Sequence, residues 1–198
     1  MPRKPPLQER IVDTAVELAD EGGWPAVRLH RVAARLGVSL AEIRAHYPDL
    51  DAVANAWLGR ADDAMLALAE RADLVDAPAP DRIAAALTAW FTALGGRRRM
   101  LGSILSYKLQ PSHIHLQAAL VVATSRRVQW LREAARLDAM DRQKSVEESG
   151  LTLLFAATVL RWLNDSSENF ERTRAFIAHC LEGADRLMVS RVMAKFLS

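Results

Sequence analysis

The chain has 198 residues, of which 51% are hydrophobic and 25% are charged, and its formal net charge at pH 7 is +2. This length suits one or two compact units with a sizeable core, and the apolar share excludes an intrinsically disordered chain. Its one cysteine, Cys180, excludes an intramolecular disulfide framework. There is no secretory signal pattern, and the longest apolar run, residues 151–163, is too short and too interrupted to span a bilayer, so we expect a cytoplasmic protein.

Apolar residues near the start of the chain recur at the spacing of α-helices. Residues 11–19 predict one helix, which Gly22 and Gly23 end, and residues 29–36 predict a second, which Gly37 ends. A helix, a glycine-containing turn and a short further helix make a helix-turn-helix, whose second helix can enter the major groove of DNA.

The third helix begins at a capping box. Ser39 can accept a hydrogen bond from the third amide of the helix, while the side chain of Glu42 reaches back to the N–H of Ser39. Pro48 ends this helix. Ile43 and Tyr47 share one of its faces, and we expect that face to dock on the two preceding helices.

Helical spacing continues through the rest of the chain, without strand-like alternation. Asp49 can cap a long helix over about residues 50–74, and the proline-containing segment 76–81 is the clearest linker. Further helices are expected at residues 82–94, up to 110, from Ser112 to about 137, 142–164 and 169–189. We therefore expect an all-α fold, with a helix-turn-helix domain over residues 1–48, a connecting helix over 49–74 and a helical domain over 75–198.

The stretch IVDTAVELADEGGWPAVRLHRVAARLGVSLAEIRAHYPDLDAV, residues 11–53, resembles the DNA-binding domain of the TetR family. The matching features are a helix that ends in glycine before an aromatic residue, the Val-Ala pair of the second helix, Gly-Val-Ser, and the closing His-Tyr-Pro. The resemblance implies a TetR-like fold with a C-terminal ligand-binding and dimerisation domain. It also implies a ligand-responsive transcriptional repressor that binds a pseudo-palindromic operator in double-stranded DNA as a homodimer.

The resemblance also implies which residues lie at the DNA. These are Arg28, Arg31, Ser39, Leu40, Ala41, Arg44, Ala45, His46 and Tyr47. We expect the three arginines to contact phosphates, and Leu40 and the two alanines to lie nearest the bases. The family often has Ser or Thr where this chain has Arg28, Tyr where it has Arg44, and Lys where it has Leu50. Arginine can still pair with phosphate, whereas Leu50 cannot. The alternative is therefore a helix-turn-helix domain that no longer binds DNA.

Aromatic and polar residues of the second half predict a ligand pocket. The candidates are Trp90, Tyr107, His113, Trp130, Phe155 and Trp162. Such rings provide apolar area with a polar group at one end, which favours a small apolar or amphipathic effector.

Arg126 and Arg127 are expected on a solvated helix face. Residues 142–164 and 169–189 are expected to form the homodimer interface, because the apolar stretch 151–163 predicts burial on several sides.

No cofactor, metal site or enzymatic activity is expected. His113 and His115 point about 200° apart on a helix, so they do not share a metal ion. His179 and Cys180 have no partner at ligand spacing. No glycine-rich phosphate loop or nucleophile elbow is present in the sequence.

A second stretch gives an alternative function. LRWLNDSSENFERTRAFIAHCLEGADRLM, residues 160–188, is similar to the C-terminal region of TetR-like lipid-binding proteins of ubiquinone biosynthesis. The matching residues are Asp165, Ser166, Ser167, Phe170, Glu171, Thr173 and Phe176. This similarity implies an accessory protein that holds isoprenoid lipid without binding DNA, with residues 189–198 helping it to dock on a membrane. Residues 125–143 lack the aspartate-rich motif of that family.

Overall fold

The computed structural model describes residues 5–196 of the chain, and the side chains of residues 5–183. Every regular element in that range is helical: α1 (Leu7–Gly22), η1 (Trp24–Ala26), α2 (Leu29–Leu36), α3 (Leu40–His46), α4 (Leu50–Ala69), α5 (Ala72–Val75), α6 (Ala79–Ala93), α7 (Arg98–Lys108), α8 (Ile114–Ala134), α9 (Asp141–Leu163), η2 (Glu168–Phe170) and α10 (Glu171–Phe196). The expected all-α fold is confirmed. None of the described helices has the length and apolar character needed to cross a bilayer.

The chain divides into two compact units. The first contains the residues up to Ala61 together with Gly96–Ala119, and the second contains Asp62–Gly95 together with the residues from Leu120 onward. The boundary therefore falls inside α4 and α8. The predicted linear division at residues 49 and 75 did not anticipate that residues 96–119 would pack with the N-terminal helices.

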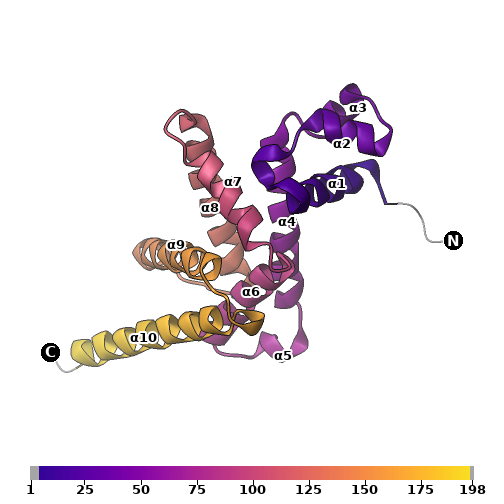
Figure 1. The fold of residues 1–198 in the computed structure, drawn as a ribbon. Helices are drawn as coiled ribbons and strands as arrows, with labels where there is room; N and C mark the ends of the chain where they lie inside the picture. Colours follow the sequence, from indigo (N-terminus) through magenta and orange to yellow (C-terminus); the bar gives the residue numbers. More distant parts are fainter. Residues whose placement is uncertain (1–4, 197–198) are drawn as a thin grey trace. The chain divides into compact units, whose positions relative to one another are not determined.

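Helices α1 to α3 form the head of the first unit (Figure 1). α1 packs on α2 and η1, and α2 packs on α3. Gly37 ends α2 in the left-handed conformation, with φ 67° and ψ 36°. Glycine adopts this conformation without the steric cost that a Cβ imposes, so the predicted glycine turn follows from backbone geometry.

Helix α3 is fixed by its predicted cap and by its inward face. The N–H of Glu42 donates to Ser39 Oγ at 3.2 Å, and the N–H of Ser39 donates to Glu42 Oε2 at 2.8 Å. The Ser39 N–H and hydroxyl both donate to the Glu42 carboxylate and so lower the pKa of Glu42. Ile43 and Tyr47 are buried, and the Tyr47 hydroxyl donates to the carbonyl of Gln8 at 3.4 Å. The predicted docking of this face on the preceding helices is confirmed.

The predicted helix over residues 50–74 is wrong at its C-terminal end. Asp49 does cap α4, since the N–H of Ala52 donates to Asp49 Oδ1 at 2.7 Å. However, α4 ends at Ala69, Arg71 has extended backbone angles (φ −70°, ψ 131°), and α5 follows as a separate short helix. The Arg71 guanidinium pairs with Asp73 at 2.8 Å and so closes the turn into α5. No glycine or proline marks this break in the sequence.

Two other predicted helix starts also differ from the structure. α6 begins at Ala79 rather than at residue 82, with Pro80 in its first turn, where a missing N–H costs nothing. α8 begins at Ile114, and the backbone carbonyl of His113 accepts the first helical hydrogen bonds, so Ser112 is not its cap.

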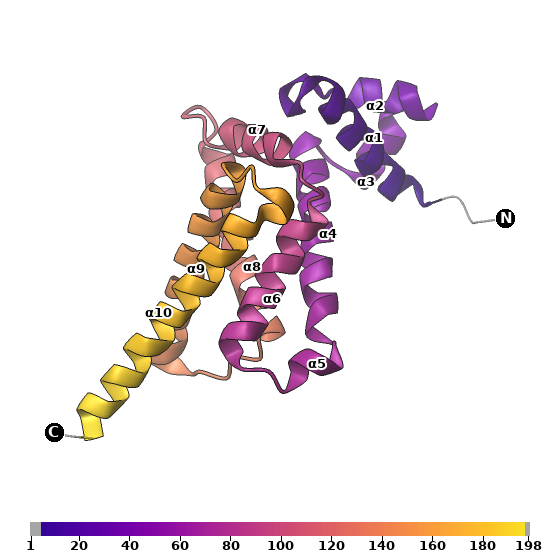
Figure 2. The same ribbon diagram turned by 60° about the horizontal axis from the view of Figure 1, so that its bottom comes forward.

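The second unit is organised around α6, which packs on α10, and α10 packs in turn on α9 (Figures 1 and 2). Four buried rings fill its centre. The ring centroid of Trp90 lies 4.9 Å from that of Phe91 and 5.1 Å from that of Phe155, both edge to face. The Trp162 ring lies 5.5 Å from that of Phe91. Edge-to-face rings at these separations stabilise the core beyond the area they bury.

An ion pair is buried beside these rings. Trp90 Nε1 donates to Asp62 Oδ1 at 2.7 Å, and the Arg127 guanidinium donates to both Asp62 oxygens, with Nη2 2.9 Å from Oδ2. The guanidinium carbon of Arg127 lies 5.2 Å from the Trp90 ring centroid and 5.7 Å from that of Phe155. The expected solvated position of Arg127 is therefore wrong, because its charge is neutralised by a residue 65 positions away.

Asp165 caps the junction between α9 and α10. It is buried and accepts hydrogen bonds from the N–H and hydroxyl of Ser167 and from the N–H and hydroxyl of Thr173. Burial favours the neutral acid, but the four hydrogen bonds outweigh burial and hold the pKa of Asp165 well below its ordinary value. The turn into α10 therefore depends on a charged carboxylate.

We expect Asp165→Asn to lower the free energy of unfolding at about pH 7 by roughly 1–3 kcal/mol, because an amide cannot accept all four hydrogen bonds. A carboxyl whose pKa is lower in the folded than in the unfolded state stabilises the fold above its unfolded pKa and loses that effect as the pH falls. The difference from the native chain should therefore shrink below about pH 4. Urea unfolding followed by circular dichroism measures both effects. Asp138→Asn, at an exposed position, is the control, and an equal loss at both pH values would contradict the assignment.

Candidate nucleic-acid interface and ligand groove

The outward face of α3 is small and largely apolar. Helical geometry of about 100° per residue places Ala41 and Ala45 opposite the buried Ile43. Both alanines are exposed, and Arg44 is exposed at one edge of this face. Leu40, at the start of α3, is 53% exposed. This face has the size and exposure of a helix that can enter a major groove.

The arginines around α3 divide into held and free side chains. Arg28 Nη1 donates to the carbonyls of Pro25 and Val27 at 2.7 Å and 2.8 Å, which holds its guanidinium against the turn before α2. Arg35 pairs with Glu21 at 2.7 Å and lowers the pKa of that carboxyl.

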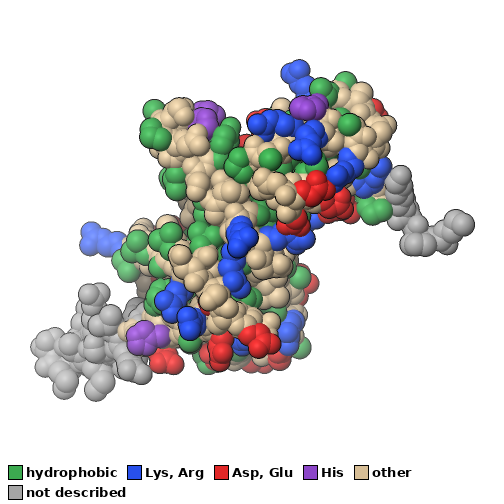
Figure 3. Space-filling model, in the orientation of Figure 1, with side chains coloured by type: hydrophobic (Ala, Val, Ile, Leu, Met, Phe, Trp, Pro, Cys, Tyr) green, Lys and Arg blue, Asp and Glu red, His purple; other side chains and the backbone are tan. Residues whose placement is uncertain are grey.

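Arg31 and Arg44, in contrast, make no hydrogen bond or ion pair with any residue that the structure describes. Figure 3 shows basic side chains and a histidine on the surface over α2 and α3. Positive charge available at this surface is what neutralisation of DNA phosphates requires.

The nine residues predicted at the DNA are not equally accessible. Eight of them are exposed, while the buried ring of Tyr47 packs within the head. Ser39 is exposed, but its hydroxyl is occupied by the capping box. His46 is exposed at the end of α3. The structure therefore leaves the two free arginines and the outward face of α3 as the groups best placed for a nucleic acid.

Leu50, where the TetR pattern has lysine, borders a cavity inside the first unit. The cavity has a volume of about 160 Å³ and is also lined by Trp24, Ile104, Tyr107 and Leu116, among others. Leu50 is half-buried there, so its side chain serves packing between η1, α7 and the start of α4. Asp49, Asp51 and His115 line the same cavity, so Leu50 packs beside polar as well as apolar side chains.

The start of α4 is also fastened by a buried ion pair. The Lys108 ammonium of α7 is buried and donates to Asp51, and it lies 3.3 Å from Asn55 Oδ1. A buried ammonium needs such partners, because desolvation otherwise penalises its charge. Sequence spacing gave no sign of this pair, whose members are 57 positions apart.

The structure does not bring the six predicted ligand residues into one site. Trp90, Phe155 and Trp162 are packed together in the core of the second unit, while Trp130 on α8 is 55% exposed. The other two, Tyr107 and His113, belong to the first unit.

Tyr107 and His113 contact each other. Their ring centroids are 4.5 Å apart, and the His113 ring also lies 6.0 Å from that of His115. His113 Nδ1 lies 3.0 Å from the carbonyl of Tyr107. Among the described residues, no group of three or more His, Cys, Asp or Glu side chains is placed to hold a metal ion.

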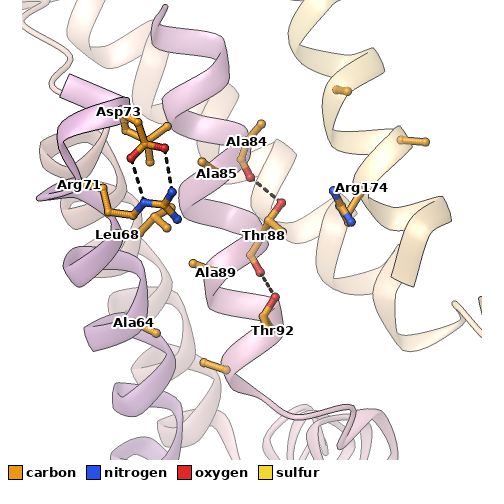
Figure 4. Close-up of a pocket in the computed structure, with 14 residues that line it drawn as sticks. Ala64, Leu68, Arg71, Asp73, Ala84, Ala85, Thr88, Ala89, Thr92 and Arg174 are labelled. Atoms are coloured by element: carbon orange, nitrogen blue, oxygen red, sulfur yellow. Dashed lines mark hydrogen bonds and ion pairs between the residues drawn. The ribbon is translucent and has the colours of Figure 1, made fainter. Parts of the chain in front are cut away.

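An open groove with a volume of about 860 Å³ lies in the second unit between α4, α5, α6 and α10 (Figure 4). Half of its lining side chains are alanines, joined by Leu68 and Leu74. Thr88 and Thr92 line it too, but their hydroxyls donate to carbonyls of their own helix at 2.7 Å. Arg174 points into the groove from α10. The groove is therefore apolar apart from its charged rim.

None of the six predicted ligand residues lines this groove. The signal for it was present in the sequence as small residues at i, i+3, i+4 and i+7 along α6: Ala85, Thr88, Ala89 and Thr92. A helix face of small side chains leaves room beside it, whereas large aromatic residues at helical spacing fill the core instead. Attention to the aromatic residues alone therefore missed the open space.

Comparison with solved structures gives one strong similarity. The TetR transcriptional regulator from Nitrosomonas europaea is 42% identical in sequence, with a TM-score of 0.80, and the match covers 91% of this chain and 99% of that one. A regulatory protein of the TetR family from Rhodococcus is 19% identical, with a TM-score of 0.50 and coverage of 90% and 97%. The regulator PfmR from Thermus thermophilus is 18% identical, with a TM-score of 0.51 and coverage of 87% and 97%. The latter two share the fold.

The family model for COQ9 matches residues 149–188, and no curated protein matches the chain. The COQ9 match contains Asp165, Ser167 and Thr173, which form the hydrogen-bonded cap between α9 and α10. A structural role of these residues accounts for their resemblance, and the match covers only a short part of the chain. The similarity to the Nitrosomonas regulator extends over both units, so the chain belongs to the TetR family of transcriptional regulators.

Proposed function

We propose that the protein is a ligand-responsive repressor that binds a pseudo-palindromic DNA operator as a homodimer and catalyses no reaction. The observation that supports DNA binding is the exposure of α3 and of the arginines around it in the domain formed by α1 to α3. α3 is capped and docked through one face, its opposite face is exposed, and Arg31 and Arg44 make no hydrogen bond or ion pair with the described residues. An exposed helix face with cations beside it is what binding in the major groove and neutralisation of phosphates require.

We expect Arg31→Ala to weaken binding to all DNA sequences and to reduce the slope of log affinity against log salt by about one unit, because one phosphate contact is lost. Mobility shifts against the DNA that flanks the coding sequence, run at several salt concentrations, measure both quantities. Arg35→Ala is the matched control, since Arg35 is already paired with Glu21. If the native chain bound none of this DNA at low salt, the repressor proposal would be withdrawn.

The dimer proposal is supported by an apolar stripe on α9, which lies beside α10 (Figure 2). Val146, Leu153 and Leu160 are spaced by seven residues and are 69%, 72% and 64% exposed. A seven-residue spacing keeps side chains on one helix face, and a two-fold axis pairs the same face of both copies. Two heads related in this way suit half-sites separated by whole turns of DNA.

Leu153→Glu should convert the dimer into a monomer at micromolar concentration, because each copy would bring an unpaired charge into the shared face. Light scattering coupled to size-exclusion chromatography gives the mass directly. Val121→Glu, an equally exposed apolar position on α8, should leave the mass of the dimer unchanged. A native chain that runs as a monomer would refute the interface.

We assign the effector to the groove between α4, α5, α6 and α10. Its volume is typical of ligand sites, and its alanine-rich walls fit an apolar or amphipathic molecule. Arg71 is neutralised by Asp73, whereas Arg174 has no partner in the described part of the chain and can meet a ligand carboxylate or sulfonate. Under the repressor proposal, the effector binds the DNA-incompetent state more tightly, because only differential affinity shifts the equilibrium.

Ala89→Trp should abolish binding of the amphipathic anionic dye anilinonaphthalene sulfonate, because an indole at this position fills the groove. Fluorescence titration of the dye measures the loss, which should reach at least about tenfold in affinity. Ala118→Trp, at an exposed alanine outside the groove, is the control. Unchanged dye binding in Ala89→Trp would remove the groove as the site, while DNA binding by the same variant shows that the head is intact.

The lipid-carrier alternative is not favoured. Its matching residues include the cap around Asp165, and the similarity to the Nitrosomonas regulator covers nearly the whole chain. The tail at residues 189–198, which that alternative would use at a membrane, lies outside the side chains that the structure describes.

A further inference from the structure

Two rows of side chains define the outward surface of α3. Leu40 and Arg44 are four residues apart and form one row, and Ala41 and Ala45 form the row beside it. Residues spaced by four lie one above the other on a helix. Ala41 and Ala45 lie about 160° from the buried Ile43, whereas Leu40 and Arg44 lie about 60° and 100° from it and flank the outward face.

Arg44 is the side chain in these rows that can donate hydrogen bonds. Leu40 and the two alanines offer only apolar contact. Ser39 and Glu42, next to the rows, are occupied by each other in the capping box. His46 lies on the far flank of α3, about 160° from Arg44 at 100° per residue. Arg44 is therefore the side chain on this face of α3 that can donate hydrogen bonds to a base.

The alanines determine how closely that guanidinium can approach the bases. Side chains of one carbon at positions 41 and 45 let the backbone of α3 lie near the floor of the major groove. An arginine at the edge of such a helix can then reach the base edges. Guanine presents two acceptors there, O6 and N7, which match the two parallel donors of a guanidinium. No other base presents two acceptors on its major-groove edge.

We propose that Arg44 reads a guanine in each operator half-site and that Leu40 contacts a thymine methyl group close to it. This assignment rests on the proposed DNA binding and goes beyond it. If Arg44 contacted only phosphate, the two rows could distinguish base sequences only through apolar contacts of Leu40 and the two alanines. The rise between Leu40 and Arg44 is about 6 Å, four residues at about 1.5 Å. That distance corresponds to about two base steps of about 3.4 Å. The half-site should therefore hold a guanine and a thymine about two steps apart.

The test uses the full-length protein and the operator fragment that it retains in mobility shifts. Each guanine of one half-site is replaced in turn by deazaguanine, which lacks N7, and each thymine by uracil, which lacks the methyl group. For the native chain, one guanine position should weaken binding about tenfold, and one thymine position, about two steps away, should weaken it severalfold. Arg44→Ala should bind both guanine forms equally and should lose about ten- to a hundredfold of its preference for G·C over A·T at that position. Leu40→Ala should no longer distinguish thymine from uracil at the paired position.

Arg44→Lys separates base reading from simple charge, because lysine keeps the cation but lacks the two-donor fork. We expect this variant to keep most of the salt dependence and to lose most of the preference for guanine. The inference is overturned if deazaguanine has no effect at any position. It is also overturned if Arg44→Ala weakens binding equally for all sequences and flattens the salt slope, as a phosphate contact would; the proposed repressor function then still stands. If the native chain binds no DNA, the proposed function and the inference both fail.

Discussion

The Asp62 carboxylate is the interaction on which the interior of the second unit depends. It satisfies the indole N–H of Trp90 and the guanidinium of Arg127, which come from two different helices. The same guanidinium lies over the Trp90 and Phe155 rings, so the ion pair and the aromatic core form one packed cluster. Removing the Asp62 carboxylate would leave the nearly buried Arg127 guanidinium without this partner, at a cost of about 3–5 kcal/mol. The relative positions of α4, α6 and α8 within this unit are therefore set by electrostatics as much as by burial.

Local signals in the sequence were sufficient for the head. Gly37, the capping box at Ser39 and Pro48 act on their immediate neighbours, and the helices end where these residues predict. The break between α4 and α5 had no such signal, because no glycine, proline or capping residue precedes the extended backbone at Arg71, where an ion pair with Asp73 closes the turn. Arg127 was misjudged for a related reason. Its burial depends on a carboxylate 65 positions away, and periodicity carries no information about such distant partners.

Two features of the sequence that pointed away from DNA binding have structural explanations. Leu50 replaces a cation of the family pattern, but it borders a cavity inside the first unit, next to the buried pair of Lys108 and Asp51. The residues shared with lipid-binding proteins include Asp165, whose four hydrogen bonds hold the start of α10. In both places, a residue that differs from one family or resembles another serves the packing of this fold. Neither position bears on what the exposed surface of α3 recognises.

The separation between the two sides of α3 has an evolutionary consequence. The stability of the head is carried by Ile43, Tyr47 and the capping box, whereas Ala41, Arg44 and Ala45 contact nothing that the fold requires. Exposed substitutions with no packing role typically change stability by less than about 0.5 kcal/mol. A duplicated copy of the gene can therefore acquire new binding specificity through changes at these three positions without passing through unfolded intermediates. Only one side of the seven-residue helix α3 is needed for packing, so the DNA sequence that it recognises can change while the fold of the domain stays the same.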